Sequence, residues 1–249
     1  MFIKLKNQFV VIILAAGKGT RMKSNLPKVL HNIGGQPMIM HVVNKAKRLG
    51  AQKIITVIGY QAEKIKKSLI NEKIEFAYQL EQKGTGHAVL QCHDLLKDFK
   101  GNVLILSGDV PLISCETLKK LLLNHEKNNV DASILTTEIS SPTGYGRIIR
   151  NNNSLLKEIV EEVDASDKQR LIKEINSGIY AFKSNFLFNV LPLVKNKNTQ
   201  NEYYLPDVFQ HIINKNGKVA IEKTKNYSEI QGVNNIEELS ILNLNYEKN

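Results

Sequence analysis

Two glycines and several basic side chains stand close together between Leu14 and Lys28. The segment Leu14–Met22 reads LAAGKGTRM, and the pair Pro-Lys ends the stretch at Lys28. Glycine lets a backbone approach a ligand closely, and successive N–H groups in such a loop can point at phosphate oxygens. Lys18, Arg21 and Lys28 add positive charge. The pattern predicts a phosphate-binding loop; the alternative is a strand-to-helix turn with solvated lysines.

Two familiar phosphate loops do not fit this segment. A dinucleotide fingerprint needs a third glycine where Met22 stands, and an acidic residue about 20 positions further on. A P-loop needs Gly-Lys-Ser/Thr after four intervening residues, and that pattern is absent. A nicotinamide-dependent dehydrogenase is therefore disfavoured.

A second candidate segment, Gln79–Ala88, reads QLEQKGTGHA. The side-chain amide of Gln79 offers a donor and an acceptor to the edge of a planar base. The glycines on either side of Thr85 permit close backbone contact. A polar loop whose following helix is capped by Thr85 is the alternative. We expect His87 to pack at the start of that helix and not to act as a catalyst.

A third segment, Ser107–Leu112, places Asp109 directly after an apolar run. A carboxylate at the end of a buried strand is costly unless it is paired or bound to a metal. Mg²⁺ prefers one or two carboxylates together with phosphate oxygens and water. A magnesium-nucleotide complex therefore suits Asp109, and an aspartate that accepts backbone N–H bonds in a turn is the alternative.

Other polar segments are weak signals when taken singly, and turns with surface polar groups explain each of them. They are Gly144–Arg147, Glu161, Asn176–Gly178, Glu202–Asp207 and Gly232–Asn235. The sequence has no G-x-S-x-G elbow and no H-E-x-x-H motif. Its six histidines and two cysteines show no metal-ligand spacing.

The elements that must position these segments alternate in the first half of the chain. Apolar strands separated by amphipathic helices predict a parallel sheet with helices on both faces. The expected strands are Phe9–Ala15, Lys53–Ile58, Ile74–Tyr78 and Val103–Ser107. The expected helices are Pro37–Leu49, Gln61–Ile70, Thr85–Leu96 and one capped by Ser114.

The second half is less regular and predicts an antiparallel addition to the same α/β domain. A hairpin is expected around Asn151-Asn152-Asn153, with strands over Arg147–Arg150 and Leu155–Val160. The remaining expected elements are Ala132–Glu138, Asn176–Phe182, Val219–Glu222 and a helix over Ile236–Leu244. Because ligands bind beyond the carboxyl ends of strands in open α/β sheets, the candidate loops are expected to meet at one edge.

Composition excludes a disordered, a collagen-like or a disulfide-stapled protein. The 249 residues are 42% hydrophobic and 23% charged, which is typical of a globular protein with a large core. The two isolated cysteines, Cys92 and Cys115, fit a reducing cytoplasm, and no apolar run is long enough to span a membrane. Lys4 and Lys6 before Phe9–Ala16 resemble a brief signal peptide, but a strand feeding a glycine-rich loop fits better.

The charge balance is uneven along the chain. The net charge is +10, and the first hundred residues hold 17 basic and 6 acidic side chains. Such a field would attract phosphorylated ligands. The 29 lysines against 5 arginines also fit solvated faces, and no basic stripe with interleaved aromatics is present. Nucleic-acid binding is therefore not expected.

Taken in order, these motifs resemble the uridylyltransferase domain of bacterial N-acetylglucosamine-1-phosphate uridylyltransferases. The resemblance covers about Val10 to Asn235 and includes G-D-V-P-L, T-G-Y-G-R, E-I-N-S-G-I-Y, E-Y-Y and G-V-N-N. It implies a Rossmann-like nucleotidyltransferase fold with a mostly parallel mixed sheet. It also implies Mg²⁺ dependence, with UTP and N-acetylglucosamine 1-phosphate giving UDP-N-acetylglucosamine and pyrophosphate.

The resemblance assigns roles to matching positions. The nucleotide would be held by Leu14, Ala15, Ala16, Gly17, Lys28, Gln79, Gly84, Thr85, Ser107, Gly108 and Asp109. The amino sugar would be held by Gly146, Glu161, Asn176 and Tyr204. The metal ligands would be Asp109 and Asn234, and the catalytic cations facing the phosphates would be Arg21 and Lys28. One domain over 1–249 is expected, with a nucleotide-binding part near 9–113 and a sugar-binding part near 131–235.

The sequence departs from the family pattern in three places. The bifunctional family members carry a C-terminal hexapeptide-repeat acetyltransferase, so acetyl transfer is not expected here and the oligomeric state stays open. Pro206 stands where similar sequences often have Thr, and Ser107 where some have an aromatic residue. Two alternatives remain: a sugar-1-phosphate nucleotidyltransferase that uses dTTP or glucose 1-phosphate, and a non-catalytic sugar-nucleotide-binding domain.

Overall fold

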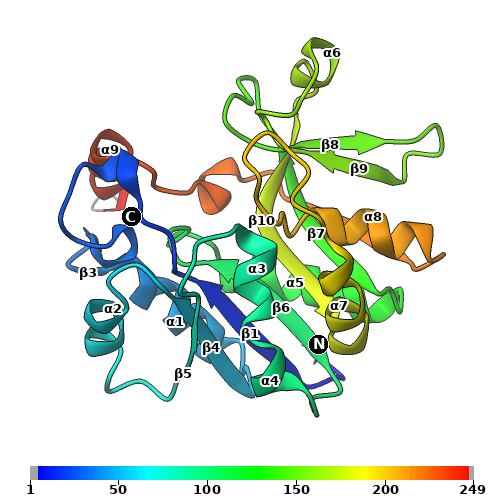
Figure 1. Cartoon of the computed structure of the whole chain (residues 1–249). Coiled ribbons are helices and arrows are strands. Elements are labelled where there is room, and N and C mark those ends of the chain that lie inside the picture. Colours follow the sequence, from blue (N-terminus) through cyan, green and yellow to red (C-terminus); the bar gives the residue numbers. More distant parts are fainter. Residues whose placement is uncertain (1–4, 247–249) are drawn as a thin grey trace.

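A mixed β-sheet forms the centre of the molecule (Figure 1). The computed structural model describes residues 5–246. The strand order is β11-β7-β10-β6-β1-β4-β5. The bounds are β1 Phe9–Leu14, β4 Lys53–Ile58, β5 Glu75–Tyr78, β6 Asn102–Ser107, β7 Ala132–Glu138, β10 Glu174–Lys183 and β11 Val219–Lys223. Strands β5, β4, β1 and β6 are mutually parallel, and β10 runs antiparallel to both β6 and β7. The expected mixed, mostly parallel sheet is confirmed.

Two small antiparallel pairs extend this framework. The expected hairpin is present as β8 (Arg147–Arg150) and β9 (Leu156–Val160), and it joins the sheet where Arg147 pairs with Ile175 of β10. A separate hairpin of β2 (Asn32–Ile33) and β3 (Gln36–Pro37) was not predicted.

Helices cover both faces of the sheet, because the strands alternate buried apolar side chains from one face to the other. On β1, Val10 and Ile12 face one core, whereas Val11 and Ile13 face the other, and all four are fully buried. Burial of each such side chain contributes about 1.5–3 kcal/mol. One face carries α1 (Met38–Arg48), α2 (Ala62–Ser68) and α5 (Cys115–Lys127). The other carries α3 (Thr85–Leu90), α4 (His93–Leu96), α7 (Ser184–Val190) and α8 (Asp207–Asn214).

A third, smaller core joins the segment that follows β1 to the helix α9 (Ile236–Tyr246). Helix α9 packs beside the β2–β3 hairpin (Figure 1), and its Leu242 shares a buried cluster with Met22, Ile33, Met38 and Val233. The side chain of Asn243 accepts a hydrogen bond from the N–H of Gly34 at 3.0 Å. This core therefore holds the glycine-rich loop near the segment that precedes α9.

Most predicted elements agree with the structure to within two residues. Ser114 does cap α5, since its Oγ accepts the N–H of Thr117 at 3.1 Å. The long helix expected over Thr85–Leu96 is wrong: it is broken into α3 and α4, and Thr85 does not cap it. Besides the β2–β3 hairpin, the elements that sequence patterns did not predict are α6 (Asp167–Arg170), α7, α8 and the 3₁₀ turns η1 (Thr20–Met22), η2 (Lys28–Leu30), η3 (Leu191–Leu193) and η4 (Tyr227–Ile230).

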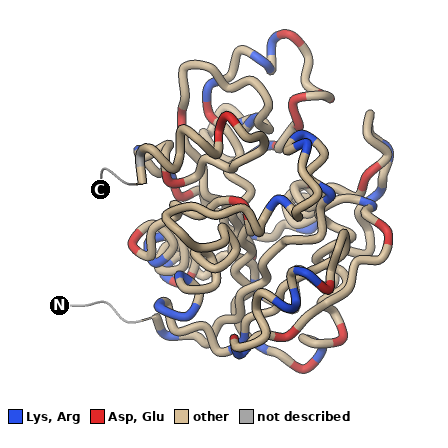
Figure 2. The backbone as a smooth tube through the Cα atoms, turned by 90° about the vertical axis from the view of Figure 1, so that its left-hand side faces the viewer, with Lys and Arg blue, Asp and Glu red and all other residues tan. Residues whose placement is uncertain are grey.

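Charged residues of both signs are interspersed over the folded chain (Figure 2). This distribution favours the interpretation that most lysines lie on solvated faces. Among the helices within residues 5–246, none combines the length and apolar character that crossing a bilayer requires.

Candidate active site

Three adjoining hollows form one cleft at the carboxyl ends of the parallel strands. The first hollow, about 280 Å³, is lined by Leu14, Ala15, Ala16, Gly17, Lys28, Val29, Gln79, Gln82, Gly84, Thr85, Ala88, Ser107, Asp109 and Glu202. The second includes Gly146, Glu161, Asn176, Ser177 and Tyr180, and it shares Leu14, Thr85 and Ser107 with the first. The third includes Arg21, Tyr227, Asn234 and Glu238, and it shares Ser107 and Asp109 with the first. Loops that follow β1, β5 and β6 therefore meet, as expected from the sheet topology.

The loop after β1 is pinned to its neighbours by backbone hydrogen bonds. The N–H of Ala15 donates to Val57 O at 2.9 Å, and the N–H of Tyr60 donates to Ala16 O at 3.1 Å. Gly19 has φ +61°, and a Cβ there would lie 2.6 Å from the Cβ of Lys28. Glycine at this position therefore gives the chain its left-handed turn and leaves space for the Lys28 side chain.

Gly108 has a structural part in the same loop region. Its N–H donates to Leu14 O at 2.9 Å, and a Cβ on it would lie 3.1 Å from that oxygen. Gly108 lies outside the residues that line the three hollows. It keeps the ends of β1 and β6 close together, so that Asp109 follows directly at the rim of the cleft.

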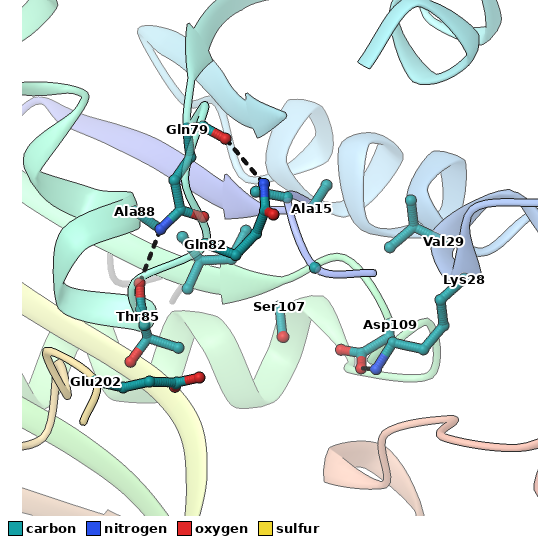
Figure 3. A pocket seen from close by; sticks show the side chains of 14 residues that line it. Ala15, Lys28, Val29, Gln79, Gln82, Thr85, Ala88, Ser107, Asp109 and Glu202 are labelled. Atoms are coloured by element: carbon teal, nitrogen blue, oxygen red, sulfur yellow. Dashed lines mark hydrogen bonds and ion pairs between the residues drawn. The ribbon is translucent and has the colours of Figure 1, made fainter. Parts of the chain in front are cut away.

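Four side chains from distant parts of the sequence converge on the boundary between the first and third hollows. Lys28 Nζ forms an ion pair with Asp109 Oδ2 (Figure 3) and lies 3.4 Å from Asn234 Oδ1. Arg21 Nη2 donates to the same Asn234 Oδ1 at 3.1 Å. The side chains of Lys28 and Asp109 are 19% and 14% exposed. Asp109 Oδ2 and Asn234 Oδ1 therefore face one shared position, and the Lys28 ammonium group occupies it.

The charge state of Asp109 follows from these contacts. Burial by itself would raise the pKa of its carboxyl group. The charge and hydrogen bond of the Lys28 ammonium, together with the Ser107 hydroxyl, outweigh burial and hold the pKa below its usual range. Asp109 is therefore a carboxylate at neutral pH, as a metal ligand must be.

Asn234 is positioned by the start of α9. The side chain of Asn235 accepts the N–H of Glu238 at 2.8 Å, and Glu238 in turn accepts the N–H of Asn234 at 2.7 Å. This reciprocal arrangement is a variant of the capping box. One residue earlier, the N–H of Val233 donates to Asp109 O at 3.0 Å. The cap and this bond together place the Asn234 amide beside Asp109.

The loop after β5 is clamped to the segment around Tyr203. The N–H of Gly86 donates to Tyr203 O at 2.7 Å, and the N–H of Tyr203 donates to Lys83 O at 2.8 Å. Gly84 has φ +101°, and a Cβ there would lie 2.6 Å from Tyr203 O. The Thr85 hydroxyl accepts the N–H of Leu205 at 3.0 Å, which explains why it does not cap α3. These glycines therefore permit the approach of two chain segments.

Gln79 and Gln82 lie on one wall of the first hollow (Figure 3). Gln79 Nε2 donates to Gly84 O at 3.0 Å and lies 3.0 Å from His87 Nδ1. Gln82 Nε2 donates to the backbone oxygen of Gln79 at 3.1 Å. The Gln79 amide is thus held in one orientation at the wall. His87 packs against it, in line with the structural role expected for this histidine.

The second hollow is built around Glu161 and a bulge in β10. Burial, and then the negative charges of Asp207 and Asp164, raise the pKa of Glu161 to about 7. A Cβ on Gly146 would lie 3.2 Å from Glu161 Oε1, so glycine leaves room for the carboxyl group. The hollow therefore contains a carboxyl group that changes its charge near neutral pH.

Asn176 is held in the bulge by its own hydrogen bonds. Its backbone N–H donates to Gly146 O at 2.9 Å, its Oδ1 accepts the N–H of Gly178 at 3.0 Å, and its Nδ2 donates to the Tyr180 hydroxyl at 2.8 Å. Gly178 has φ +76°, a conformation that favours glycine. The bulge thus fixes the amide of Asn176 at the edge of the hollow.

Tyr204 lies outside the residues that line the three hollows. It is buried, and its hydroxyl donates to Gln200 Oε1 at 2.7 Å. The site also includes side chains to which the sequence assigned no role. They include Gln82 and Glu202 in the first hollow, Tyr180 in the second and Tyr227 in the third. The E-Q-K and E-Y-Y motifs contain the first two, but only the fold shows that both face one cavity.

Metal-binding capacity is limited to a few oxygen atoms. In the described part of the chain, no group of three or more His, Cys, Asp or Glu side chains could hold a metal ion. Asp109 Oδ2 and Asn234 Oδ1 both contact the Lys28 ammonium, so they lie close enough to share one cation. A carboxylate and an amide oxygen suit a hard cation whose other ligands are phosphate oxygens and water.

Sequence comparison identifies relatives over nearly the whole chain. Residues 10–229 match the model of the nucleotidyl transferase family. The chain is 48% identical over 230 residues to the bifunctional protein GlmU of Oceanobacillus iheyensis, covering 92% of this chain and 50% of that protein. It is 49% identical over 223 residues to the bifunctional protein GlmU of Staphylococcus epidermidis, covering 90% and 49%. The chain thus spans about half the length of these relatives.

Solved structures share the fold at low sequence identity. A UDP-glucose pyrophosphorylase complexed with UDP-glucose superposes with a TM-score of 0.74 at 22% identity, covering 97% of this chain and 98% of that chain. The apo form of a UDP-glucose pyrophosphorylase also gives 0.74, at 21% identity and 97% and 99% coverage. At such identities these likenesses establish the architecture alone.

Proposed function

Since the chain belongs to the nucleotidyl transferase family, we propose that it transfers UMP from UTP to N-acetylglucosamine 1-phosphate. The products are UDP-N-acetylglucosamine and pyrophosphate. The observation that carries this proposal is the convergence of Arg21, Lys28, Asp109 and Asn234 at the boundary of adjoining hollows. The near half-identity to the proteins named GlmU supports the choice of substrates.

The two substrates are assigned to different hollows. Uracil and ribose lie in the first, where the side-chain amide of Gln79, oriented by its bond to Gly84 O, offers its remaining polar groups to the base. The amino sugar lies in the second, where Glu161 and Asn176 offer hydrogen bonds. The phosphates meet between them, beside Asp109 and Lys28. A nucleotide-binding part near 9–113 and a sugar-binding part near 131–235 follow from this division.

The chemistry needs charge neutralisation more than proton transfer. An ionised phosphate oxygen of the sugar phosphate forms a bond to the α-phosphorus of UTP, while the bond from that phosphorus to the bridging oxygen breaks. The electron pair leaves with pyrophosphate, and no general base is required. Lys28 and Arg21 lower the repulsion between the two anions and stabilise the charge on the departing group.

Members of the family generally work with a divalent metal ion, and we assign Mg²⁺ to Asp109 and Asn234. A bound Mg²⁺ would polarise the phosphate oxygens and neutralise part of their charge. The residues present fit the ion, because two oxygen donors already share one cation. Asp109 supplies a full negative charge, and the α9 cap keeps the Asn234 amide beside it.

The test is a pyrophosphate-release assay with UTP and N-acetylglucosamine 1-phosphate, with and without Mg²⁺. We expect release only when both substrates and the metal are present. Replacing UTP by dTTP, or the sugar by glucose 1-phosphate, should lower kcat/KM strongly. Equal or higher turnover with either replacement would assign the chain to another sugar nucleotide. If UDP-N-acetylglucosamine binds but no pyrophosphate is released, the chain is a non-catalytic binding domain.

A further inference from the structure

The two oxygen atoms assigned to the metal already bind a cation that belongs to the protein. Lys28 Nζ contacts Asp109 Oδ2 directly and lies 3.4 Å from Asn234 Oδ1. Arg21 Nη2 donates to the same Asn234 oxygen at 3.1 Å. An ammonium group and a metal ion compete for the same lone pairs. Both cannot occupy this position at once.

The backbone around Lys28 and Asp109 holds the pair in place, so it is not a loose surface ion pair. Lys28 begins the η2 turn, and its Cβ packs where a side chain on Gly19 would collide with it at 2.6 Å. Asp109 is anchored by the bond from the N–H of Val233 at 3.0 Å. Both side chains are largely removed from solvent. Screening by water therefore weakens this pair less than an exposed pair.

Polyphosphate offers the ammonium group another partner. The first hollow, which Lys28 lines, extends from this ion pair to Gln79 and Thr85, and the third extends from it to Arg21. A triphosphate in the cleft brings several negative charges to the same end of the Lys28 side chain. The ammonium group can then move from Asp109 to the phosphates, which frees both oxygen donors.

We propose that Lys28 is a built-in competitor of the metal, which keeps the Asp109–Asn234 site closed until a nucleoside triphosphate draws its ammonium group away. This inference rests on the proposed function and deepens it. The metal enters the cleft together with the nucleotide, and the empty protein binds free divalent cations weakly. The apparent affinity for a free cation is reduced by the fraction of molecules in which the site is open.

Binding of Mn²⁺ to the nucleotide-free protein, followed by the electron paramagnetic resonance of the free ion, tests this proposal. We expect Lys28→Met to bind Mn²⁺ at least about tenfold more tightly than the wild type, which corresponds to a site closed in about nine molecules out of ten. Lys18→Met is the matched control, because Lys18 is exposed in the same loop and its loss removes the same charge. It should change the affinity by less than about twofold.

Two outcomes would overturn the proposal. One is equal Mn²⁺ affinity in Lys28→Met and Lys18→Met. The other is tight Mn²⁺ binding to the nucleotide-free wild type at the same site, shown by its loss in Asp109→Asn. A failure of the proposed function gives a different result: Lys28→Met gains affinity as expected, but the wild type releases no pyrophosphate from UTP.

A measurement on the wild-type chain covers the case in which Lys28→Met does not fold. Reductive methylation followed by mass spectrometry reports how accessible each lysine is. Mg²⁺ at a concentration that saturates the nucleotide-free protein should displace the ammonium group and increase the methylation of Lys28, whereas Lys18 should not respond. Unchanged methylation of Lys28 at saturating Mg²⁺ would show that metal and lysine do not compete.

Discussion

Replacing Glu161 by glutamine is expected to stabilise the folded protein at pH 8 and to weaken its binding of the sugar phosphate. The carboxyl group faces the second hollow, where burial and then Asp207 and Asp164 raise its pKa from 4.5 to about 7. Asp207 is itself affected, since burial and Asp164 raise its pKa to about 6. In the empty hollow, burial and the two neighbouring aspartates therefore destabilise the ionised form of Glu161 relative to the protonated form.

The sign of the effect follows from proton binding. Because the pKa is higher in the folded state, the folded chain holds the proton more tightly than the unfolded chain does. The stability that comes from the protonated acid is complete below about pH 4.5 and is lost as the pH rises through about 7. Glutamine at 161 has no such loss. The advantage of Glu161→Gln over the wild type should therefore grow between pH 5 and pH 8.

The magnitude is set by the two pKa values. The difference between 4.5 and about 7 corresponds to ~3 kcal/mol as an upper limit, at 1.36 kcal/mol for each pKa unit. The carboxyl group lines an open hollow, so solvent reduces this value. We expect the free-energy advantage of Glu161→Gln to be about 1–2 kcal/mol larger at pH 8 than at pH 5.

Urea unfolding of both proteins at pH 5 and pH 8 measures this change. The matched control is Glu158→Gln, which removes one negative charge from a partly exposed position on β9 and reports the effect of charge alone. At pH 8 the KM of Glu161→Gln for N-acetylglucosamine 1-phosphate should rise, because an amide cannot replace a carboxylate that accepts sugar hydroxyls. A stability difference that does not widen with pH would refute the reasoning about Glu161.

Three further substitutions test other parts of the site. Lys28→Ala and Asp109→Ala should each lower kcat/KM by about 10²–10³, because each removes a preorganised charge at the phosphates; steady-state pyrophosphate release measures this, and near-normal turnover by both would remove the mechanism. Asn176→Ala should raise the KM for the sugar phosphate while leaving the KM for UTP within about twofold; an unchanged sugar KM would exclude its assigned role. Gly84→Ala places a Cβ at a φ of +101° and against the backbone of Tyr203, so thermal unfolding should show a free energy of unfolding lower by about 2 kcal/mol. A stability equal to that of the wild type would show that the contact between the two segments adjusts without a loss of stability.

The secondary structure was largely readable from local patterns. The strand over Lys53–Ile58, the strand over Ala132–Glu138 and the Ser114 cap of α5 were all predicted and are present. A run of apolar, often β-branched residues marks a buried strand, and a polar cap such as Ser114 lies within a few positions of the helix that it begins, so neighbouring residues carry the information. The order of strands and helices then places their loops at one edge of the sheet.

Short elements and loop contacts were beyond such patterns. The helix expected over Thr85–Leu96 breaks after Leu90, and Thr85 accepts a bond from Leu205 instead of capping the helix. The contact of Thr85 with Leu205 and the contacts of Asn234 with Arg21 and Lys28 join residues at least 120 positions apart. No periodicity in the intervening sequence encodes such a pair, because it depends on how the whole sheet closes.

The sequence by itself therefore determined the fold class, the segments that meet in the cleft and the family that they resemble. Only the tertiary structure decided which side chains of those segments contact one another. It brought Gly84 into contact with Tyr203, gave the buried Tyr204 hydroxyl a partner in Gln200 and placed the Lys28 ammonium beside Asp109 and Asn234. The physical reason is that local propensity acts over a few residues. A buried charge, in contrast, takes whichever partner the completed fold brings within reach.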